Sequence, residues 1–369
     1  MRKLSAAAIA GCLMLSSWTT ANAAPPSYYP TEYSQIIEAS KKEAGLTVYS
    51  NIALFNWDPI LAAFKEEYPW IKVEPTDLNA NEVFERYYAD QGAKTKSADV
   101  LLSAAPLAWL EFLPKNMIEP YQSPELGHVP AWTVPQPGVY TVSTDPFVIA
   151  YNKLMLPQAD WPSSMQEIVN LATKTPGEFD RRLGTYAPNA SAFTQAIYWG
   201  ITKLRGETAF GWFDKIGSMS DVYRTAGPIV EKITSGEYVI GYLVSSQAVL
   251  GLFTDPNREK LIGWALPKDG TVVNMRNMAI TKSSRSPNSA KLLVDFLLSK
   301  KGQTAVGKGG LVSFRDDVDD PAAMPGGLTY AKIVQQVGEA NVARVTLDPE
   351  MITGLPKIAG RLDAAFKKK

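Results

Sequence analysis

The feature of this sequence that most constrains its fold is a regular alternation of short apolar runs with amphipathic segments. A parallel strand needs a crossover of a dozen or more residues, usually a helix, before the next parallel strand. The apolar runs and the helical segments after them cover, in order, 45–50, about 58 onward, 71–78, 81–90, 98–103 and 106 onward. Three strand and helix pairs in a row predict an α/β fold with a doubly wound, mainly parallel sheet.

A long extended run over 141–153 interrupts this alternation, and no helix follows it directly. The alternation then resumes in segments over 184–187, 191–204, about 222, 228–235 and 238–244. Further extended pieces cover 261–266, 271–273 and 278–280, and helices are expected over 287–298, 303–307 and about 328–337. We interpret the first and last extended regions as two strand crossovers that join two lobes, each a mainly parallel sheet flanked by helices.

The length of the chain also predicts two lobes, because 369 residues exceed what one hydrophobic core usually serves. Pro25, Pro26 and Pro30 predict a disordered lead before the first helix. The expected organisation is a signal peptide over 1–23, the lead and first helix over 24–43, lobe 1 over 44–147 and 271–369, lobe 2 over 152–262, and crossovers near 147–152 and 263–271.

The N-terminus has the pattern of a secretory signal peptide. Arg2 and Lys3 precede an apolar run over 4–15, and small residues lead to an expected cleavage after Ala23, which places the mature chain in the periplasm. The apolar run is shorter than the roughly 20 residues that span a bilayer, so no membrane insertion of the mature chain is expected. A second interpretation stays open, because residues 9–12 resemble a lipoprotein cleavage site ending at Cys12.

Cysteine usage and charge exclude further classes of protein. Cys12 is the only cysteine, so a chain cut after Ala23 forms no disulfide and depends on its core for stability. Loss of Arg2 and Lys3 from a balance of 37 bases and 37 acids leaves 35 bases against 37 acids. Nucleic-acid binding needs a large positive patch, so nucleic acid is not an expected partner.

The sequence offers no recognisable catalytic constellation. His128 is the only histidine, and no second histidine or cysteine remains after cleavage to build a typical zinc or nucleophilic site. Residues 307–310 lack the spacing of a phosphate-binding loop. We therefore predict a protein that is not an enzyme, with no catalytic residues, no metal site and no cofactor. Paired carboxylates nevertheless leave a secreted carboxylate-based hydrolase open as an alternative.

Small and polar residues gather where the predicted strands end and helices begin. Ligands of open α/β sheets bind at this edge, where helix N-termini offer unpaired N–H groups. The candidate ligand-binding residues at these junctions are Ser50, Asn51, Ser103, Ala104, Asn189, Ala190, Ser191, Thr225, Ser245 and Ser246. Each taken singly also suits a helix cap.

Two arginines, Arg224 and Arg276, lie close to these junctions and complete the candidate set. The planar guanidinium group suits a carboxylate or a phosphate, which favours an anionic ligand. The alternative is that both are ordinary surface arginines.

The order of the segments resembles the family 1 extracellular solute-binding proteins of ABC importers, in the branch with the periplasmic ferric-iron binders. The matching segments are LTVYS at 46–50, SADVLLS at 97–103, FVIAYN at 147–152, KITSGEYVIGYLVSS at 232–246, WALPKDGTVV at 264–273, and a helix over 286–298 followed by KKGQ at 300–303. The resemblance implies a two-lobed type II periplasmic binding fold that closes on its ligand by hinge motion and serves a membrane permease, with a monomer as the expected state.

One departure from the iron-binding branch bears on the ligand. Iron binders of this kind have two adjacent tyrosines just after the strand that ends here at Val244, where this chain has Ser245, Ser246 and Gln247. Tyr242 or Tyr223 could supply a single phenolate. The preferred function is capture of a small organic anion, such as a carboxylate, phosphonate or phosphorylated compound, for an ABC permease. Binding of ferric iron or a ferric chelate is the alternative.

Overall fold

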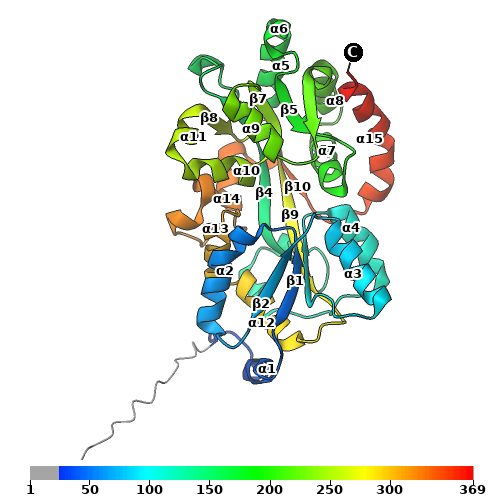
Figure 1. Cartoon of the computed structure of the whole chain (residues 1–369), viewed down its shortest axis with the longest axis vertical. Helices are drawn as coiled ribbons and strands as arrows, with labels where there is room; N and C mark the ends of the chain where they lie inside the picture. The colour runs from blue at the N-terminus through cyan, green and yellow to red at the C-terminus, as the bar shows by residue number, and fades with distance from the viewer. Residues whose placement is uncertain (1–24, 369) are drawn as a thin grey trace, which may run out of the picture.

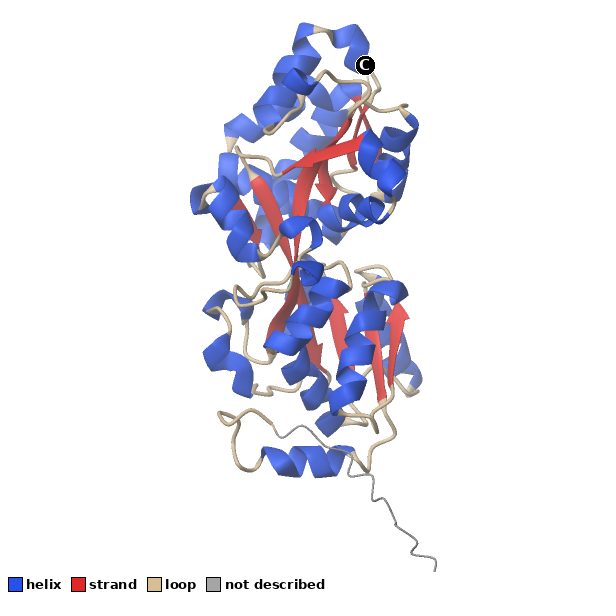
Figure 2. Ribbon diagram, turned by 90° about the vertical axis from the view of Figure 1, so that its left-hand side faces the viewer, coloured by secondary structure: helices blue, strands red, loops and turns tan. Residues whose placement is uncertain are grey.

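The structure, a computed structural model, describes residues 25–368, so the expected signal peptide and Cys12 lie outside the described residues. Two lobes stand one above the other and are joined at a narrow waist (Figures 1 and 2). The strands form one continuous path in the order β2-β1-β3-β9-β4-β7-β5-β6, with β10 beside β9 and β8 beside β4. This arrangement confirms the predicted α/β class and the two-lobed fold.

Lobe 1 contains the first three strand and helix pairs. Its elements are α1 (Tyr33–Ser40), β1 (Leu46–Ser50), α2 (Leu54–Glu67), β2 (Val73–Asp77), α3 (Glu82–Ala93), β3 (Val100–Ser103), α4 (Pro106–Phe112), α12 (Pro287–Leu298) and α13 (Lys300–Lys308). Val48 and Leu102 pack on one side of the sheet, and Tyr49 and Leu101 belong to the core on the other side. Burial on both faces explains why β1 and β3 are apolar without alternation.

Lobe 2 repeats this layering with the second set of segments. Its elements are α5 (Met165–Lys174), α6 (Pro176–Phe179), β5 (Leu183–Tyr186), α7 (Ala192–Arg205), α8 (Glu207–Ile216), β6 (Ser220–Tyr223), α9 (Gly227–Ser235), β7 (Ile240–Ser245), α10 (Ser246–Leu250), α11 (Pro256–Leu261) and β8 (Ile262–Ala265). No helix in the described part of the chain is long and apolar enough to cross a membrane.

Two long strands, β4 (Val139–Asn152) and β9 (Thr271–Ile280), connect the lobes, and every residue of both is buried. β4 pairs with β9 from Val139 to Pro146 and with β7 from Phe147 onward, so it leaves one lobe and enters the other between these residues. β9 pairs with β3 at one end and with β10 (Val342–Val345) at the other. The segments predicted at 271–273 and 278–280 are thus the two ends of one strand.

The end of the chain departs from its expected place in lobe 1. After α14 (Tyr330–Val337) and β10, the C-terminal helix α15 (Glu350–Phe366) packs against α7 and α8 of lobe 2 (Figure 1). The ring of Phe366 lies 5.7 Å from that of Phe213 and 5.6 Å from that of Tyr198. The apolar face of α15 thus completes the lobe 2 core. The other expected lobe limits stay predictions.

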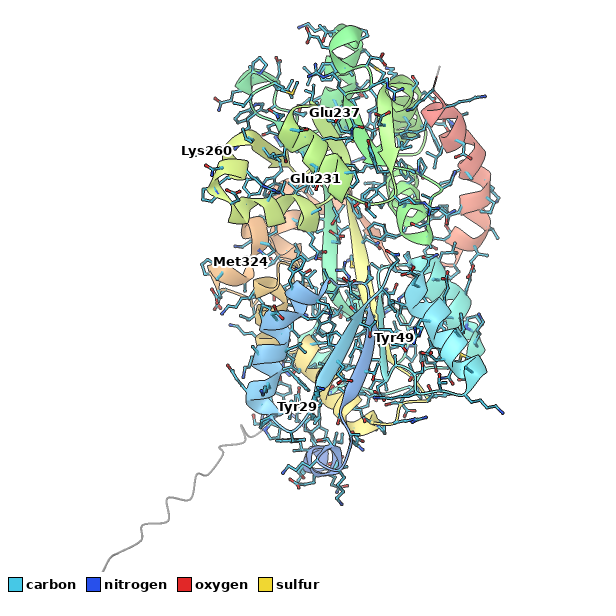
Figure 3. The ribbon with its side chains drawn as sticks, in the orientation of Figure 1. Tyr29, Tyr49, Glu231, Glu237, Lys260 and Met324 are labelled. Atoms are coloured by element: carbon cyan, nitrogen blue, oxygen red, sulfur yellow. The ribbon has the colours of Figure 1, made fainter. Side chains whose placement is uncertain are left out.

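The proline-rich lead is also more ordered than predicted. The hydroxyl groups of Tyr28 and Tyr29 donate to Oε1 of Glu125, at 2.7 and 2.8 Å. Tyr29 lies at the far end of lobe 1, below the sheet (Figure 3). Proline content alone predicted disorder, but the tyrosines between the prolines anchor the lead to the lobe.

A buried carboxyl group, Asp295, fixes α12 beneath this lead. Its side chain is 1% exposed, and Oδ2 accepts hydrogen bonds from Tyr33 at 2.8 Å and Tyr121 at 2.6 Å. Burial raises the pKa of Asp295 to about 6, although the hydrogen bonds oppose the shift. Between about pH 4 and pH 6 the folded protein therefore retains a proton that the unfolded chain has lost.

This difference predicts a pH-dependent stability. The contribution of Asp295 to the free energy of unfolding is fully present below about pH 4 and is lost as the pH rises through about 6, a change of about 3 kcal/mol. Asp295→Asn keeps a neutral acceptor at every pH, so it should be more stable than the wild type at pH 7.5 and equal to it at pH 4. Urea unfolding between pH 4 and 8 measures this, with the exposed Asp316→Asn as control; a pH-independent difference would contradict it.

Candidate functional site

A cleft of about 690 Å³ is lined by residues of both lobes. Lobe 1 contributes the turns after β1 and β2 and the first turns of α2 and α3, and lobe 2 contributes the segments after β5, β6 and β7. Between these walls, residues of β4 and β9 complete the lining. The carboxyl ends of five strands thus meet at the cleft, as the rule for open α/β sheets predicts.

Charged and polar side chains lie on one face of the two connecting strands. Asp145 of β4 is paired with Asn274 of β9, and Ser143 is paired with Arg276. Because side chains alternate along a strand, residues two apart point to the same face. All four side chains therefore share a face, and Asp145 and Arg276, both cleft residues, are diagonal neighbours. We call Asp145 and Arg276 the charged floor of the cleft.

Arg276 is held in place by both lobe 1 and β4. Its side chain donates from Nε to Oδ1 of Asn51 at 3.2 Å and from NH1 to Oγ of Ser143 at 2.9 Å. The residue is only 3% exposed. Burial lowers the pKa of Arg276, and the Asp145 carboxylate opposes that shift by favouring the charged guanidinium.

Asp145 is held from the lobe 2 side. Its two carboxylate oxygens accept from Oγ of Ser245 at 2.8 and 2.9 Å, and the residue is 4% exposed. Burial raises the pKa of Asp145, whereas Arg276, Ser245 and the backbone N–H of Gln247 lower it. The charged floor therefore contains a buried acid and a buried base. Asp145 is hydrogen-bonded to Ser245, and Arg276 is hydrogen-bonded to Asn51 and Ser143.

The N-terminus of α7 opens onto the lobe 2 wall of the cleft. Ser191 caps this helix: its hydroxyl accepts from the backbone N–H of Thr194 at 3.2 Å, and the Thr194 hydroxyl accepts from the backbone N–H of Ser191 at 3.1 Å. Ser191 therefore has the cap role that its sequence position also suited. It also lines the cleft, where the helix dipole favours negative charge.

Aromatic side chains and one polar contact between the lobes complete the cleft. Tyr186 and Phe193 line it from lobe 2, and Phe55 of α2, 71% exposed, lines it from lobe 1. Nε2 of Gln247, in lobe 2, donates to Oδ1 of Asn56, in lobe 1, at 2.8 Å. The two walls therefore already touch at one point beside the cleft.

The structure brings most of the sequence candidates together but not all. The cleft is lined by Asn51, Ala190, Ser191, Arg224, Thr225, Ser245 and Arg276, and its lining does not include Ser50, Ser103, Ala104, Asn189 and Ser246. The hydroxyl of Ser50 accepts from the N–H of Ile52, and that of Ser103 donates to the carbonyl of Ala80. Asn189 donates to Asp363 of α15 at 2.7 Å. These three side chains bind other groups of the protein and do not line the cleft.

Sequence reasoning missed Asp145, because it considered only residues after strands. The signal was present: an aspartate stands inside the long extended run over 141–153, and a charge that such a run would bury usually has a partner or a function. Ser143, inside the same strand, was missed for the same reason, whereas Gln247 was missed although it follows β7. Among the described residues, no group of three or more histidine, cysteine and acidic side chains could hold a metal ion.

Comparison with known proteins agrees with this architecture. Residues 60–327 match the family of bacterial extracellular solute-binding proteins. The major ferric iron-binding protein of Neisseria meningitidis serogroup B is 24% identical over 225 residues, which are 59% of this chain and 65% of that protein. The match thus spans just under two thirds of the relative's length.

Two solved structures share the fold across both lobes. The substrate-binding protein of an ABC transporter from Agrobacterium tumefaciens has a TM-score of 0.74 at 22% identity, over 87% of this chain and 95% of its own. The periplasmic binding protein AfuA from Actinobacillus pleuropneumoniae, with exogenous fructose-6-phosphate bound, has a TM-score of 0.65 at 17% identity, over 86% of this chain and 98% of its own. Both likenesses show the type II periplasmic binding fold. Because the family match covers well over half of the chain, the protein belongs to the bacterial extracellular solute-binding proteins.

Proposed function

We propose that this protein captures a small organic solute with an anionic group in the interlobe cleft, in the periplasm, and delivers it to an ABC permease. The observation that carries the proposal is Arg276, a buried arginine in the lining of a cleft that both lobes share. A buried cation is retained where it has a partner or a task. A carboxylate, phosphonate or phosphate is the ligand group that matches it.

The hydrogen bonds of Arg276 leave room for such a group. A guanidinium has five N–H donors, and the bonds to Asn51 and Ser143 use two of them. The N-terminus of α7 at Ser191 adds a partial positive charge on the opposite wall. Arg224 is exposed at the lobe 2 wall and would contribute less, because solvent screens it.

Closure of the lobes would bury the ligand. β4 and β9 are the strands that pair across the waist, so a change of dihedral angles along them would move one lobe against the other. Phe55, exposed on lobe 1, would then cover the cleft from one side, opposite Tyr186 and Phe193. The bond between Gln247 and Asn56 already joins the two lobes beside the cleft.

The alternative cargo is ferric iron or a ferric chelate, which the name of the Neisseria relative favours. Tyr186 is the phenol in the cleft lining, but burial and the nearby Asp145 raise its pKa, which makes a phenolate ligand for ferric ion harder to form. Ser245 and Ser246 occupy the positions where the iron-binding branch has tyrosines. A ferric chelate whose carboxylates bind Arg276 fits these residues better than a bare ferric ion does.

A secreted hydrolase is the remaining alternative. It predicts that a bound compound is converted to a product, whereas a binding protein releases the compound unchanged.

A ligand screen by thermal shift tests the anionic anchor. Among sugar phosphates, phosphonates, dicarboxylates, aromatic acids, polyamines and ferric chelates, we expect compounds with an anionic group to raise the melting temperature. A ligand at a hundredfold excess over its Kd stabilises the folded state by about 2.7 kcal/mol. If only polyamines raised the melting temperature, the proposal would be wrong.

Replacement of the arginines then locates the anchor. Arg276→Gln should weaken binding of the best anionic ligand by about 1.5–3 kcal/mol, because it removes charged hydrogen bonds in a buried site. Arg224→Gln should weaken it by less than about 1 kcal/mol. Isothermal titration calorimetry measures both, and Arg285→Gln, exposed on lobe 1, is the matched control. Equal affinity of the Arg276 variant and the wild type would remove Arg276 from the site.

A spectroscopic titration separates the iron alternative. We expect no visible charge-transfer band when ferric ion is added as its nitrilotriacetate complex, because burial and the nearby Asp145 oppose ionisation of Tyr186. Such a band, present in the wild type and lost in Tyr186→Phe, would establish phenolate coordination and favour the iron function. Tyr49→Phe, a buried tyrosine of lobe 1, is the control for nonspecific effects.

A further inference from the structure

The charges that line the cleft do not suit a simple anion. The two bases of the lining are Arg224 and Arg276, whereas its acids are Asp77, Glu82, Glu85 and Asp145. The lining therefore carries two more acids than bases. A ligand with negative charge alone would be drawn to Arg276 but would also face this excess of carboxylates as the lobes close, where interactions between charges strengthen because water leaves.

We propose that the natural solute is a zwitterion, whose anionic group binds Arg276 and whose ammonium group binds Asp145. This inference rests on the proposed function, because it assumes that Arg276 anchors a solute in the cleft. It names the class of substrate more narrowly: small amino acids, amino-alkyl phosphates and related compounds with both charges.

The geometry of the floor supports both contacts at once. Asp145 and Arg276 are diagonal neighbours on one face of an antiparallel pair, so their α-carbons lie about 7–8 Å apart. No ion pair within 4.0 Å joins them among the described residues. Each is instead held by its own neighbours, Ser245 for the acid and Asn51 and Ser143 for the base. The two charges are therefore more than 4.0 Å apart on the same face of the strands, and each is open to a separate group of one ligand.

Asp145 also has acceptor capacity to spare. A carboxylate offers about four lone-pair sites, and Asp145 accepts from one hydroxyl and one backbone N–H. An ammonium group placed there would favour the ionised form that burial disfavours. A cation without an anionic group would leave the buried Arg276 unpaired and repelled, which argues against polyamines.

The lobe 1 wall adds to the attraction for a cation. Asp77 and Glu85 are exposed there, at the last residue of β2 and on the first turn of α3. Glu82 accepts from the backbone N–H of Asn79 at 2.9 Å, so its carboxylate has a structural role as well. Closure of the lobes would bring this acidic wall of lobe 1 over the ammonium group of a zwitterion and attract it. The same wall would repel a ligand that has only negative charge.

Matched probes test the inference on the wild-type protein. The first set is β-alanine, propionate and propylamine, and the second is phosphoethanolamine, ethyl phosphate and ethanolamine. By calorimetry, the zwitterion of at least one set should bind about tenfold tighter than its anionic and cationic partners, as one charged hydrogen bond implies. The inference would be overturned if the anionic probes bound as tightly as the zwitterions, or if only anions of the wider screen bound. The proposed function would stand in both cases. A protein that binds neither these probes nor any anion of the wider screen would overturn both.

Variants assign the ammonium contact to Asp145. Asp145→Asn keeps an acceptor for Ser245 but loses the charge, so the zwitterion should bind about tenfold more weakly while the matching anion binds equally or more tightly. Asp180→Asn, exposed on lobe 2 far from the cleft lining, should change neither affinity. Equal losses for zwitterion and anion would mean that Asp145 serves only to hold the floor, and would overturn the inference. Because Asp145 is buried, Glu85→Gln on the exposed wall provides a second test, with a smaller loss in the same direction expected.

Discussion

The pairing of β4 with β9 is the constraint on which the rest of the structure depends. These two strands belong to both lobes, and every one of their residues is buried. A strand buried on both faces normally contains only apolar residues, yet Ser143, Asp145, Asn274 and Arg276 lie side by side in the middle of this pair. The same segment therefore joins the lobes and presents the charges that face the cleft.

Much of the fold could be predicted from the alternation of apolar runs and amphipathic helices, because that pattern follows directly from burial on two faces of a parallel sheet. The place of α15 could not. Its apolar residues indicate a buried helix face, but only the three-dimensional arrangement shows that Leu362 and Phe366 complete the core beside α7 and α8. The ordered lead depends likewise on Glu125, about a hundred residues away in sequence.

The candidate site was predictable at the level of segments more than of side chains. Each strand end reaches the cleft side of its lobe, but whether a serine there faces a ligand or its own backbone depends on local turn geometry. Ser191 does both, whereas the Ser50 hydroxyl binds within its turn. Of the residues that the sequence analysis missed, Asp145 most changes the expected charge of the ligand. Two arginines indicated an anion, and the buried acid diagonal to one of them is the reason to propose a ligand with a pair of charges.

The return of the chain to lobe 2 has a consequence for the order in which the molecule can assemble. After β9 the chain builds α12 and α13 of lobe 1, and only then passes through α14 and β10 to α15. During synthesis the residues of α7 and α8 that α15 covers are made more than a hundred residues before their cover. Lobe 1 can therefore complete its core first. The apolar surface of α7 and α8 in lobe 2 stays uncovered until α15 has been synthesised.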